Sequence, residues 1–109
     1  MSLADRRCRP AARGTPPLDA AQLAPLAAEV PCWTVEQDRR IRRAFRFPDF
    51  ATALAFVNAV GAEAESQGHH PDLSLGWGRV EVTLTTHDIG GLAESDFILA
   101  ARIDRIASG

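Results

Sequence analysis

Apolar and polar residues alternate from Arg79 to Leu84, and this pattern constrains the fold more than any other part of the sequence. A period of two with β-branched residues is typical of a strand that is buried on one face only. Gly76-Trp77-Gly78 precedes the run and predicts a tight turn, because glycines allow positive φ. A short strand over about 72–75 comes before the turn. The sequence therefore predicts a β-hairpin whose apolar face must be covered by another layer.

The rest of the chain supplies that layer and a second hairpin. Period-two patterns predict two further strands, over 33–35 and 41–47. Apolar residues at helical spacing predict three helices, over about 19–29, 49–67 and 93–107. Asp19 and Gln22 form a capping box at the first helix start, and Gly68 suits a left-handed helix stop. The order αββαββα predicts an α+β domain, with a four-stranded antiparallel sheet and three helices on one face.

Length and composition limit the classes of protein to consider. A chain of 109 residues with 46% hydrophobic residues can form one globular domain. We predict that residues 1–16, rich in Arg and Pro, are a flexible tail and that 17–109 are the domain. Cys8 and Cys32 form no disulfide framework, which favours a reduced, cytoplasmic protein. No apolar run approaches the roughly 18 residues that span a bilayer.

Five arginines fall in and beside the second predicted strand, and they allow two interpretations. They could bind phosphate, or they could form the solvent edge and outer face of a sheet, which we favour. The formal net charge of −2 also gives no reason to expect nucleic acid as a partner. The arginines are Arg39, Arg40, Arg42, Arg43 and Arg46.

The three histidines of the chain occupy only two places, one at each outer end of the predicted hairpin. His69 and His70 precede its first strand, and Pro71 pushes His70 out of the helical region. His87 follows its second strand. Because the outer ends of a short hairpin are neighbours, His70 and His87 should lie close together at one end of the sheet. Imidazoles gathered there could give and take protons at neutral pH.

Other interpretations of the histidines remain open. They could be three unrelated surface residues. They could also bind zinc, although an adjacent pair suits one ion poorly and no cysteine assists. Ser66 and Ser74 lack the context of a catalytic nucleophile, and no helix follows Gly76-Trp77-Gly78 as a dinucleotide site requires.

The histidine segments carry a resemblance to a known family. Glu65…His69-His70-Pro71 and Thr86-His87-Asp88-Ile89-Gly90-Gly91-Leu92…Asp96 resemble the pattern E-x-x-x-H-H-P, then T-H-x-x-G-G-L-x-x-x-D, of the pterin-4a-carbinolamine dehydratases. This family is also called the dimerisation cofactor of a hepatocyte homeodomain factor. The separation of the two segments matches, and weaker similarity covers about 18–107. The combined motif is far more specific than a lone glycine loop.

The resemblance implies a fold, an activity and partners. The fold is helices on one face of a four-stranded antiparallel sheet, as the residue pattern also predicts. Dimers join sheets edge to edge, and some members form tetramers. The activity is dehydration of 4a-hydroxytetrahydrobiopterin to quinonoid dihydrobiopterin, in recycling that follows aromatic amino acid hydroxylation. It needs no cofactor and no metal, and it involves no nucleic acid and no membrane.

The resemblance also assigns expected roles to residues. His70 would engage the 4a-hydroxyl group, while His69 and His87 would supply the remaining acid and base in an order left open. Glu65 and Asp96 would orient imidazoles or polar edges of the pterin. The other expected contributors to substrate binding are Gly68, Pro71, Thr85, Thr86 and Asp88.

The chain departs from the better-known animal members, which carry aspartate at Gly68, tryptophan at Leu73, arginine at Ser95 and a Tyr-Asn turn near Trp77-Gly78. Trp77 could replace the aromatic wall lost at Leu73, or it could pack under the hairpin. Ala93 cannot cap the last helix with its side chain. We expect Asp96 to bond the backbone N–H of residue 93 instead, so Asp96 could be structural, catalytic or both.

Three functions compete. The first is the dehydratase. The second is a non-catalytic dimeric binding module that acts as a protein-assembly or transcription cofactor, which would be free to lose its histidines. The third is a nucleic-acid binder that uses the arginines, whose retention on DNA would depend strongly on salt. Retention of all three histidines favours the enzyme.

Overall fold

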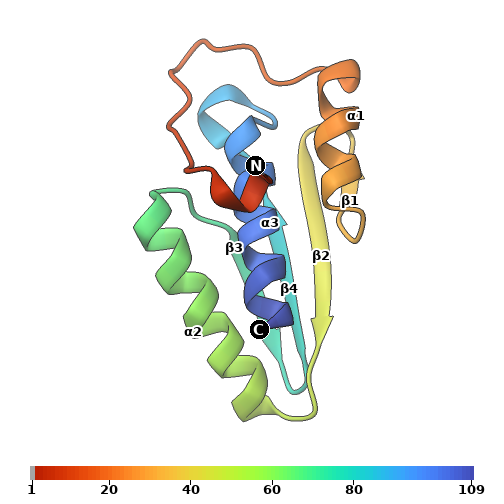
Figure 1. Cartoon of the computed structure of the whole chain (residues 1–109), viewed down its shortest axis with the longest axis vertical. Coiled ribbons are helices and arrows are strands. Elements are labelled where there is room, and N and C mark those ends of the chain that lie inside the picture. The colour runs from red at the N-terminus through yellow and green to blue at the C-terminus, as the bar shows by residue number, and fades with distance from the viewer. Residues whose placement is uncertain (1) are drawn as a thin grey trace.

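The computed structural model describes residues 2–109 as an α+β fold, as the sequence predicts (Figure 1). The helices are α1 Ala20–Glu29, α2 Phe50–Gln67 and α3 Glu94–Ser108, with short 3₁₀ helices η1 Leu3–Asp5 and η2 His87–Ile89. The strands are β1 Thr34–Glu36, β2 Arg40–Arg46, β3 Asp72–Gly76 and β4 Arg79–Leu84. They form one antiparallel sheet in the order β1-β2-β4-β3. Within residues 2–109, no helix is long and apolar enough to cross a membrane.

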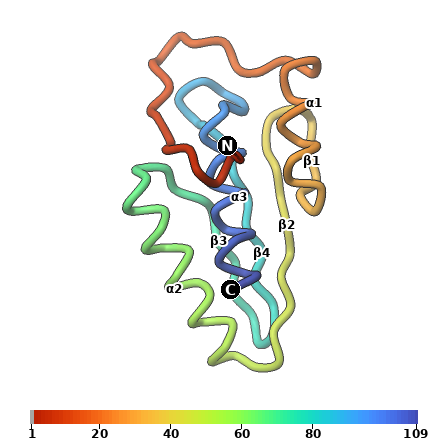
Figure 2. The backbone as a smooth tube through the Cα atoms, viewed as in Figure 1, coloured from red at the N-terminus to blue at the C-terminus, as the bar shows by residue number. Residues whose placement is uncertain are grey.

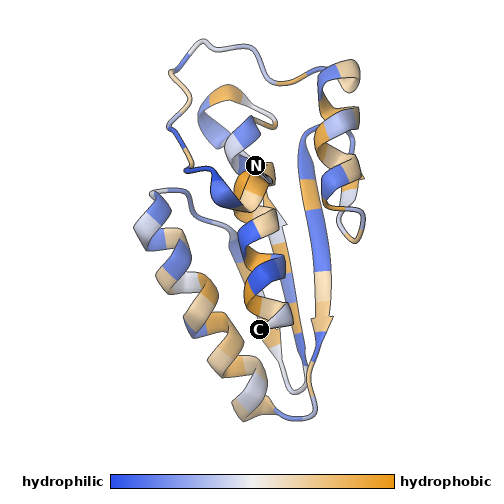
Figure 3. Cartoon of the chain, viewed as in Figure 1, coloured by the Kyte–Doolittle hydropathy of each residue, from blue (hydrophilic) through white to orange (hydrophobic). Residues whose placement is uncertain are grey.

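The helices lie on one side of the sheet, and the core fills the space between the two layers (Figures 1 and 2). Alternate residues of β2 and β4 face the helices, so Ile41, Phe45 and Val82 are buried while their neighbours in the strands are not. Apolar positions recur along the helices and strands (Figure 3). The period-two pattern therefore identified the buried face correctly.

The register of the second hairpin determines which ends meet. Asp72, the first residue of β3, pairs with Thr83 near the end of β4. At the end of α2, Gly68 adopts a left-handed conformation with φ 64° and stops the helix, as predicted. The segments that follow α2 and β4 consequently leave the sheet at the same end.

The hairpin turn corrects one expectation. Neither Gly76 nor Gly78 has positive φ; that conformation occurs instead at Gln37 and Asp38, between β1 and β2. Gly78 is needed for a close approach, because a Cβ there would lie 2.6 Å from the carbonyl oxygen of Phe47. Trp77 is 74% exposed at this turn, so it neither packs under the hairpin nor reaches the histidines at the other end.

This difference between the two glycines gives a matched test. Gly78→Ala should lower the free energy of unfolding by about 1–3 kcal/mol, because the backbone of Phe47 must move. Gly76→Ala should leave it within about 0.5 kcal/mol, because nothing lies within 4 Å of its added Cβ. Urea denaturation of both variants measures the contrast, and equal losses would contradict the close approach.

The N-terminal segment also differs from expectation. The sequence predicts a flexible tail over 1–16, of which Met1 lies outside the described residues. Residues 2–9 instead pack on the body of the protein, and we call them the N-terminal strap. Leu3 is 1% exposed and belongs to the core cluster, and η1 contacts α3. Arg105 of α3 pairs with Asp5 over 3.0 Å. Residues 10–16 are largely exposed, as a tail would be.

The two cysteines should report this packing. Cys8 is half-buried in the strap, and burial raises the pKa of its thiol to about 11. Cys32 is exposed. Because the thiolate is the reactive form, iodoacetamide at pH 8 should modify Cys32 at least about tenfold faster than Cys8. Peptide mass spectrometry at timed intervals measures both rates, and equal rates would mean that the strap is not packed in solution.

Candidate functional site

The two histidine segments line one open pocket of about 270 Å³ at the end of the sheet where α2 and β4 stop. The first wall comes from residues 68–70, after the left-handed stop of α2. The second comes from residues 85–88, after β4. The hairpin argument thus correctly predicted that these segments are neighbours. The lining residues are Gly68, His69, His70, Thr85, Thr86, His87 and Asp88.

His69 is fixed in orientation by a buried carboxylate. Its Nε2 lies 2.6 Å from Oδ1 of Asp96, and only 14% of its side chain is exposed. Asp96 itself is fully buried in the first turn of α3. A carboxylate oxygen accepts hydrogen bonds, so this contact places the ring proton on Nε2 and leaves Nδ1 free of that proton in the neutral ring.

Asp96 also joins three parts of the structure. Its Oδ2 accepts a hydrogen bond from Thr86 Oγ1 at 2.7 Å and another from the backbone N–H of Ala93 at 2.9 Å. The second bond is the one expected for a helix that begins at alanine. One carboxylate therefore connects the segment after α2, the segment after β4 and the start of α3.

His70 and His87 are more accessible than His69. The side chain of His70 is 59% exposed, and its Nε2 bonds a carboxylate oxygen of Glu65 in the last turns of α2. His87 is exposed in η2, which is closed by a bridge between Thr86 and Gly91. The site thus presents one partly buried, fixed imidazole beside two accessible ones, an arrangement that can hold and transfer protons at a small ligand.

Not all of the residues expected to bind substrate line the pocket. Neither Pro71 nor Glu65 lines the pocket, and Glu65 is the exposed partner of His70. The hydroxyl of Thr85 donates to the carbonyl of Arg39 over 2.6 Å, so it secures the loop to the β1–β2 turn. Gln67 and Ser95 are buried next to the site; the sequence marked Ser95 only as a departure from the animal members and did not mark Gln67.

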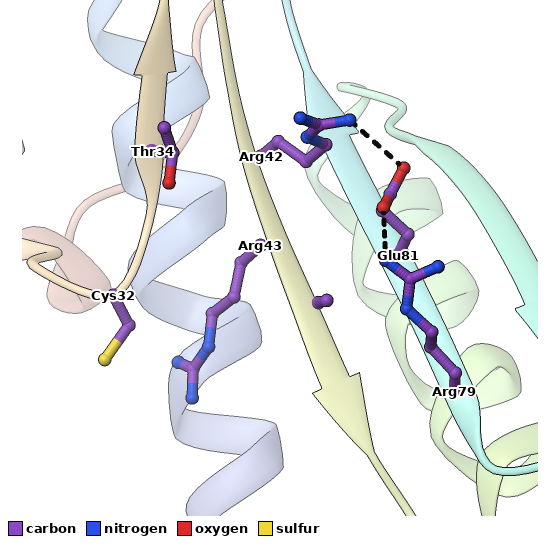
Figure 4. A pocket seen from close by; sticks show the side chains of 7 residues that line it. Cys32, Thr34, Arg42, Arg43, Arg79 and Glu81 are labelled. Carbon is purple, nitrogen blue, oxygen red and sulfur yellow. Dashed lines mark hydrogen bonds and ion pairs between the residues drawn. The ribbon is translucent and has the colours of Figure 1, made fainter.

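Other hollows of similar or larger volume lie elsewhere, and one of them is on the open face of the sheet (Figure 4). That hollow measures about 630 Å³ and contains arginines, but Glu81 pairs with Arg79 at 2.8 Å and lies 3.6 Å from Arg42. Its charge is therefore partly neutralised, which does not favour phosphate binding. Among the described residues, no group of three His, Cys, Asp or Glu is arranged to hold a metal ion.

Comparisons with known proteins identify the family of this chain. The profile of a family described as pterin 4 alpha carbinolamine dehydratase matches residues 16–106. A provisionally named pterin-4-alpha-carbinolamine dehydratase of Rubrobacter xylanophilus is 51% identical, over 95% of this chain and 97% of its own length. A protein of Halorhodospira halophila with the same provisional name is 46% identical, over 99% of this chain and all of its own length.

Two solved structures share the fold. One is described as a transcriptional coactivator/pterin dehydratase from Brucella melitensis, with a TM-score of 0.77, 33% identity, and coverage of 83% of this chain and 97% of that protein. The other is a pterin dehydratase-like protein identified as a RuBisCO assembly factor in the alpha-carboxysome. Its TM-score is 0.61 and its identity 28%, over 71% of this chain and 90% of that protein.

Proposed function

Because this chain belongs to the pterin 4 alpha carbinolamine dehydratase family, we propose that its three histidines carry out the family's reaction by general acid and base catalysis. The chain is a hydro-lyase by that membership. The observation that carries the proposal is the meeting of His69, His70 and His87 in one pocket. The substrate we propose is 4a-hydroxytetrahydrobiopterin, in the recycling of a pterin that an aromatic amino acid hydroxylase has used.

The reaction requires two proton movements, which imidazoles suit. The bond between C4a and the hydroxyl oxygen breaks, and the oxygen leaves as water after receiving a proton. The proton on N5 goes to a base, and its electron pair forms the C4a–N5 double bond of the quinonoid product. Groups that titrate near neutrality can serve as either acid or base at pH 7, so no metal is required for these steps.

We assign the leaving hydroxyl to His70, which is the accessible imidazole paired with Glu65. The contact with Glu65 fixes the orientation of the ring, and its exposure lets it reach a bound ligand. His69 and His87 supply the remaining proton transfers. The Asp96 contact supports a base role for His69, because it leaves Nδ1 able to accept a proton. Gly68, Thr85, Thr86 and Asp88 complete the binding surface.

The direct test is the decay of enzymatically generated 4a-hydroxytetrahydropterin, followed by absorbance with and without the protein. We expect acceleration that persists when a chelator is added, because imidazole proton transfer needs no metal. Acceleration that disappears with chelator and returns with added zinc would refute the metal-free mechanism. A folded protein that gives no acceleration would refute the activity for this chain.

We also propose that the chain is a homodimer. Both outer strands of the sheet, β1 and β3, have one unpaired edge in the described chain, and an edge is a template for strand addition. Three large apolar side chains, Phe50, Leu54 and Trp77, are exposed, which favours a protein contact. Sedimentation equilibrium tests this, and a monomer at micromolar concentration would exclude it.

A second candidate is a non-catalytic assembly module, supported by the similarity to the RuBisCO assembly factor. The same decay assay separates the candidates. An assembly module would show no acceleration at any protein concentration, and exchanging the histidines would leave its partner binding unchanged. The gathered histidines favour the dehydratase.

A further inference from the structure

The N-terminal strap reaches the buried side of the histidine site. The backbone N–H of Cys8 donates to Oε1 of Gln67 over 2.9 Å. The backbone N–H of Arg9 donates to Oγ of Ser95 over 2.8 Å, and the Ser95 hydroxyl donates back to the carbonyl of Arg9 over 2.8 Å. The Cys8 thiol adds a contact to the Ser95 carbonyl at 3.4 Å. The side chains of Gln67 and Ser95 are both buried.

These two residues are adjacent to the site in sequence as well as in space. Gln67 is the last residue of α2, two before His69, and Ser95 directly precedes Asp96. Helix ends have unpaired backbone groups and open most readily. The start of α3 should open more readily than other helix ends, because the side chain of Ala93 cannot cap it. Bonds from the strap hold both helix ends at the places where they carry the His69–Asp96 pair.

Further contacts keep the strap in place. The Nε of Arg102 in α3 donates to the carbonyl of Arg6 over 3.0 Å, and its Nη1 pairs with Glu63 of α2 at 2.9 Å. The Arg102 guanidinium thereby lowers the pKa of Glu63. Figures 1 and 2 show the strap running beside α3 toward the end of α2. The family profile begins at residue 16, so the strap lies outside the matched segment.

We propose that the N-terminal strap is a positioning element of the site, with Ser95 and Gln67 as the positioning residues through which it acts. It holds the end of α2 and the first turn of α3 so that His69 Nε2 stays within hydrogen-bond distance of Asp96. Neither Ser95 nor Gln67 lines the pocket, so neither touches the substrate. The effect on catalysis rests on the proposed function; the effect on the His69–Asp96 contact does not.

The test compares Ser95→Ala and Gln67→Leu with Asp49→Ala, all in the full chain. Asp49→Ala is the matched control, because it removes a side-chain bond to the N–H of Thr52 at the opposite end of α2. We expect kcat to fall about tenfold in the first two variants, with KM within about twofold, because binding groups stay while geometry is lost. All three should melt at a lower temperature, but only Ser95→Ala and Gln67→Leu should change the ¹⁵N chemical shifts of the His69 ring.

The ring shifts test the positioning of His69 by the strap, and the kinetics test the proposed activity, so the two can fail separately. Unchanged His69 ring shifts in both variants would overturn the proposal, whatever the kinetics. Equal kcat losses in Asp49→Ala would also overturn it, because the effect would then follow stability alone. If wild-type protein does not accelerate pterin dehydration, the proposed function fails, and changed ring shifts confined to Ser95→Ala and Gln67→Leu would still support the strap.

Discussion

Replacing His70 with Ala is expected to reduce kcat for 4a-hydroxytetrahydropterin dehydration by about 10²–10⁴-fold, the usual range for loss of a general acid or base. The melting temperature should not change, because 59% of the side chain is exposed and its contact with Glu65 is on the surface. Stopped-flow absorbance gives kcat, and differential scanning calorimetry gives the melting temperature. A large kinetic loss without a stability loss would assign His70 to the chemistry rather than to the fold.

Chemical rescue sharpens this prediction. Free imidazole added to the His70→Ala variant should restore part of the lost rate, because the proton transfer rather than the side chain's packing is missing. Ser74→Ala is the matched control, since Ser74 is an exposed residue of β3, on the same hairpin, outside the pocket. A His70→Ala variant that retains the wild-type kcat would remove His70 from the mechanism and leave His69 and His87 to be tested.

Much of the fold follows from local patterns. Alternation in β4 reports a strand covered on one face, and the register of the hairpin follows from that same alternation. Helix ends were predictable where a local side chain determines them, as with Asp19 and Gln22 at α1 and Gly68 at the end of α2. The observed helix ends lie within one residue of those expected.

What the sequence could not predict depends on distant contacts. Gly78 is required by the carbonyl of Phe47, in another part of the chain, so its own sequence context suggested positive φ instead. The N-terminal strap contacts residues about 60–100 positions away, and a stretch rich in Arg and Pro has no periodicity that would reveal this packing.

The candidate site was likewise predictable where local pattern determines it and not where distant contacts do. Hairpin geometry predicted that His70 and His87 are neighbours, because strand ends are set by local pattern. The capping role of Asp96 was also predictable from its spacing to Ala93. Two features could not be predicted from local pattern: the burial of Asp96 against Thr86, and the contact of Ser95 with the N-terminal strap. Both depend on how three separate segments pack together. Local patterns thus located the site, and tertiary packing supplied its support.

Replacing Asp96 with Ala is expected to lower the free energy of unfolding by about 3–5 kcal/mol, because Thr86 Oγ1, the Ala93 N–H and His69 all lose a buried acceptor. That is a large part of the 5–15 kcal/mol typical of a domain. Urea denaturation measures the loss. The size of the effect alone cannot separate a structural role from a catalytic one, so a conservative variant is needed.

Asp96→Asn makes that separation. The amide oxygen can still accept from Thr86 and the Ala93 N–H, so at least half of the stability lost in Asp96→Ala should return. The amide NH₂ would then face His69 Nε2 and, as a donor, would force the ring proton onto Nδ1. We therefore expect kcat to stay about 10²–10⁴-fold below wild type in a stably folded protein, as for other histidines held in the wrong tautomer. If kcat recovers together with stability, Asp96 serves the fold alone, and His69 works without a carboxylate partner.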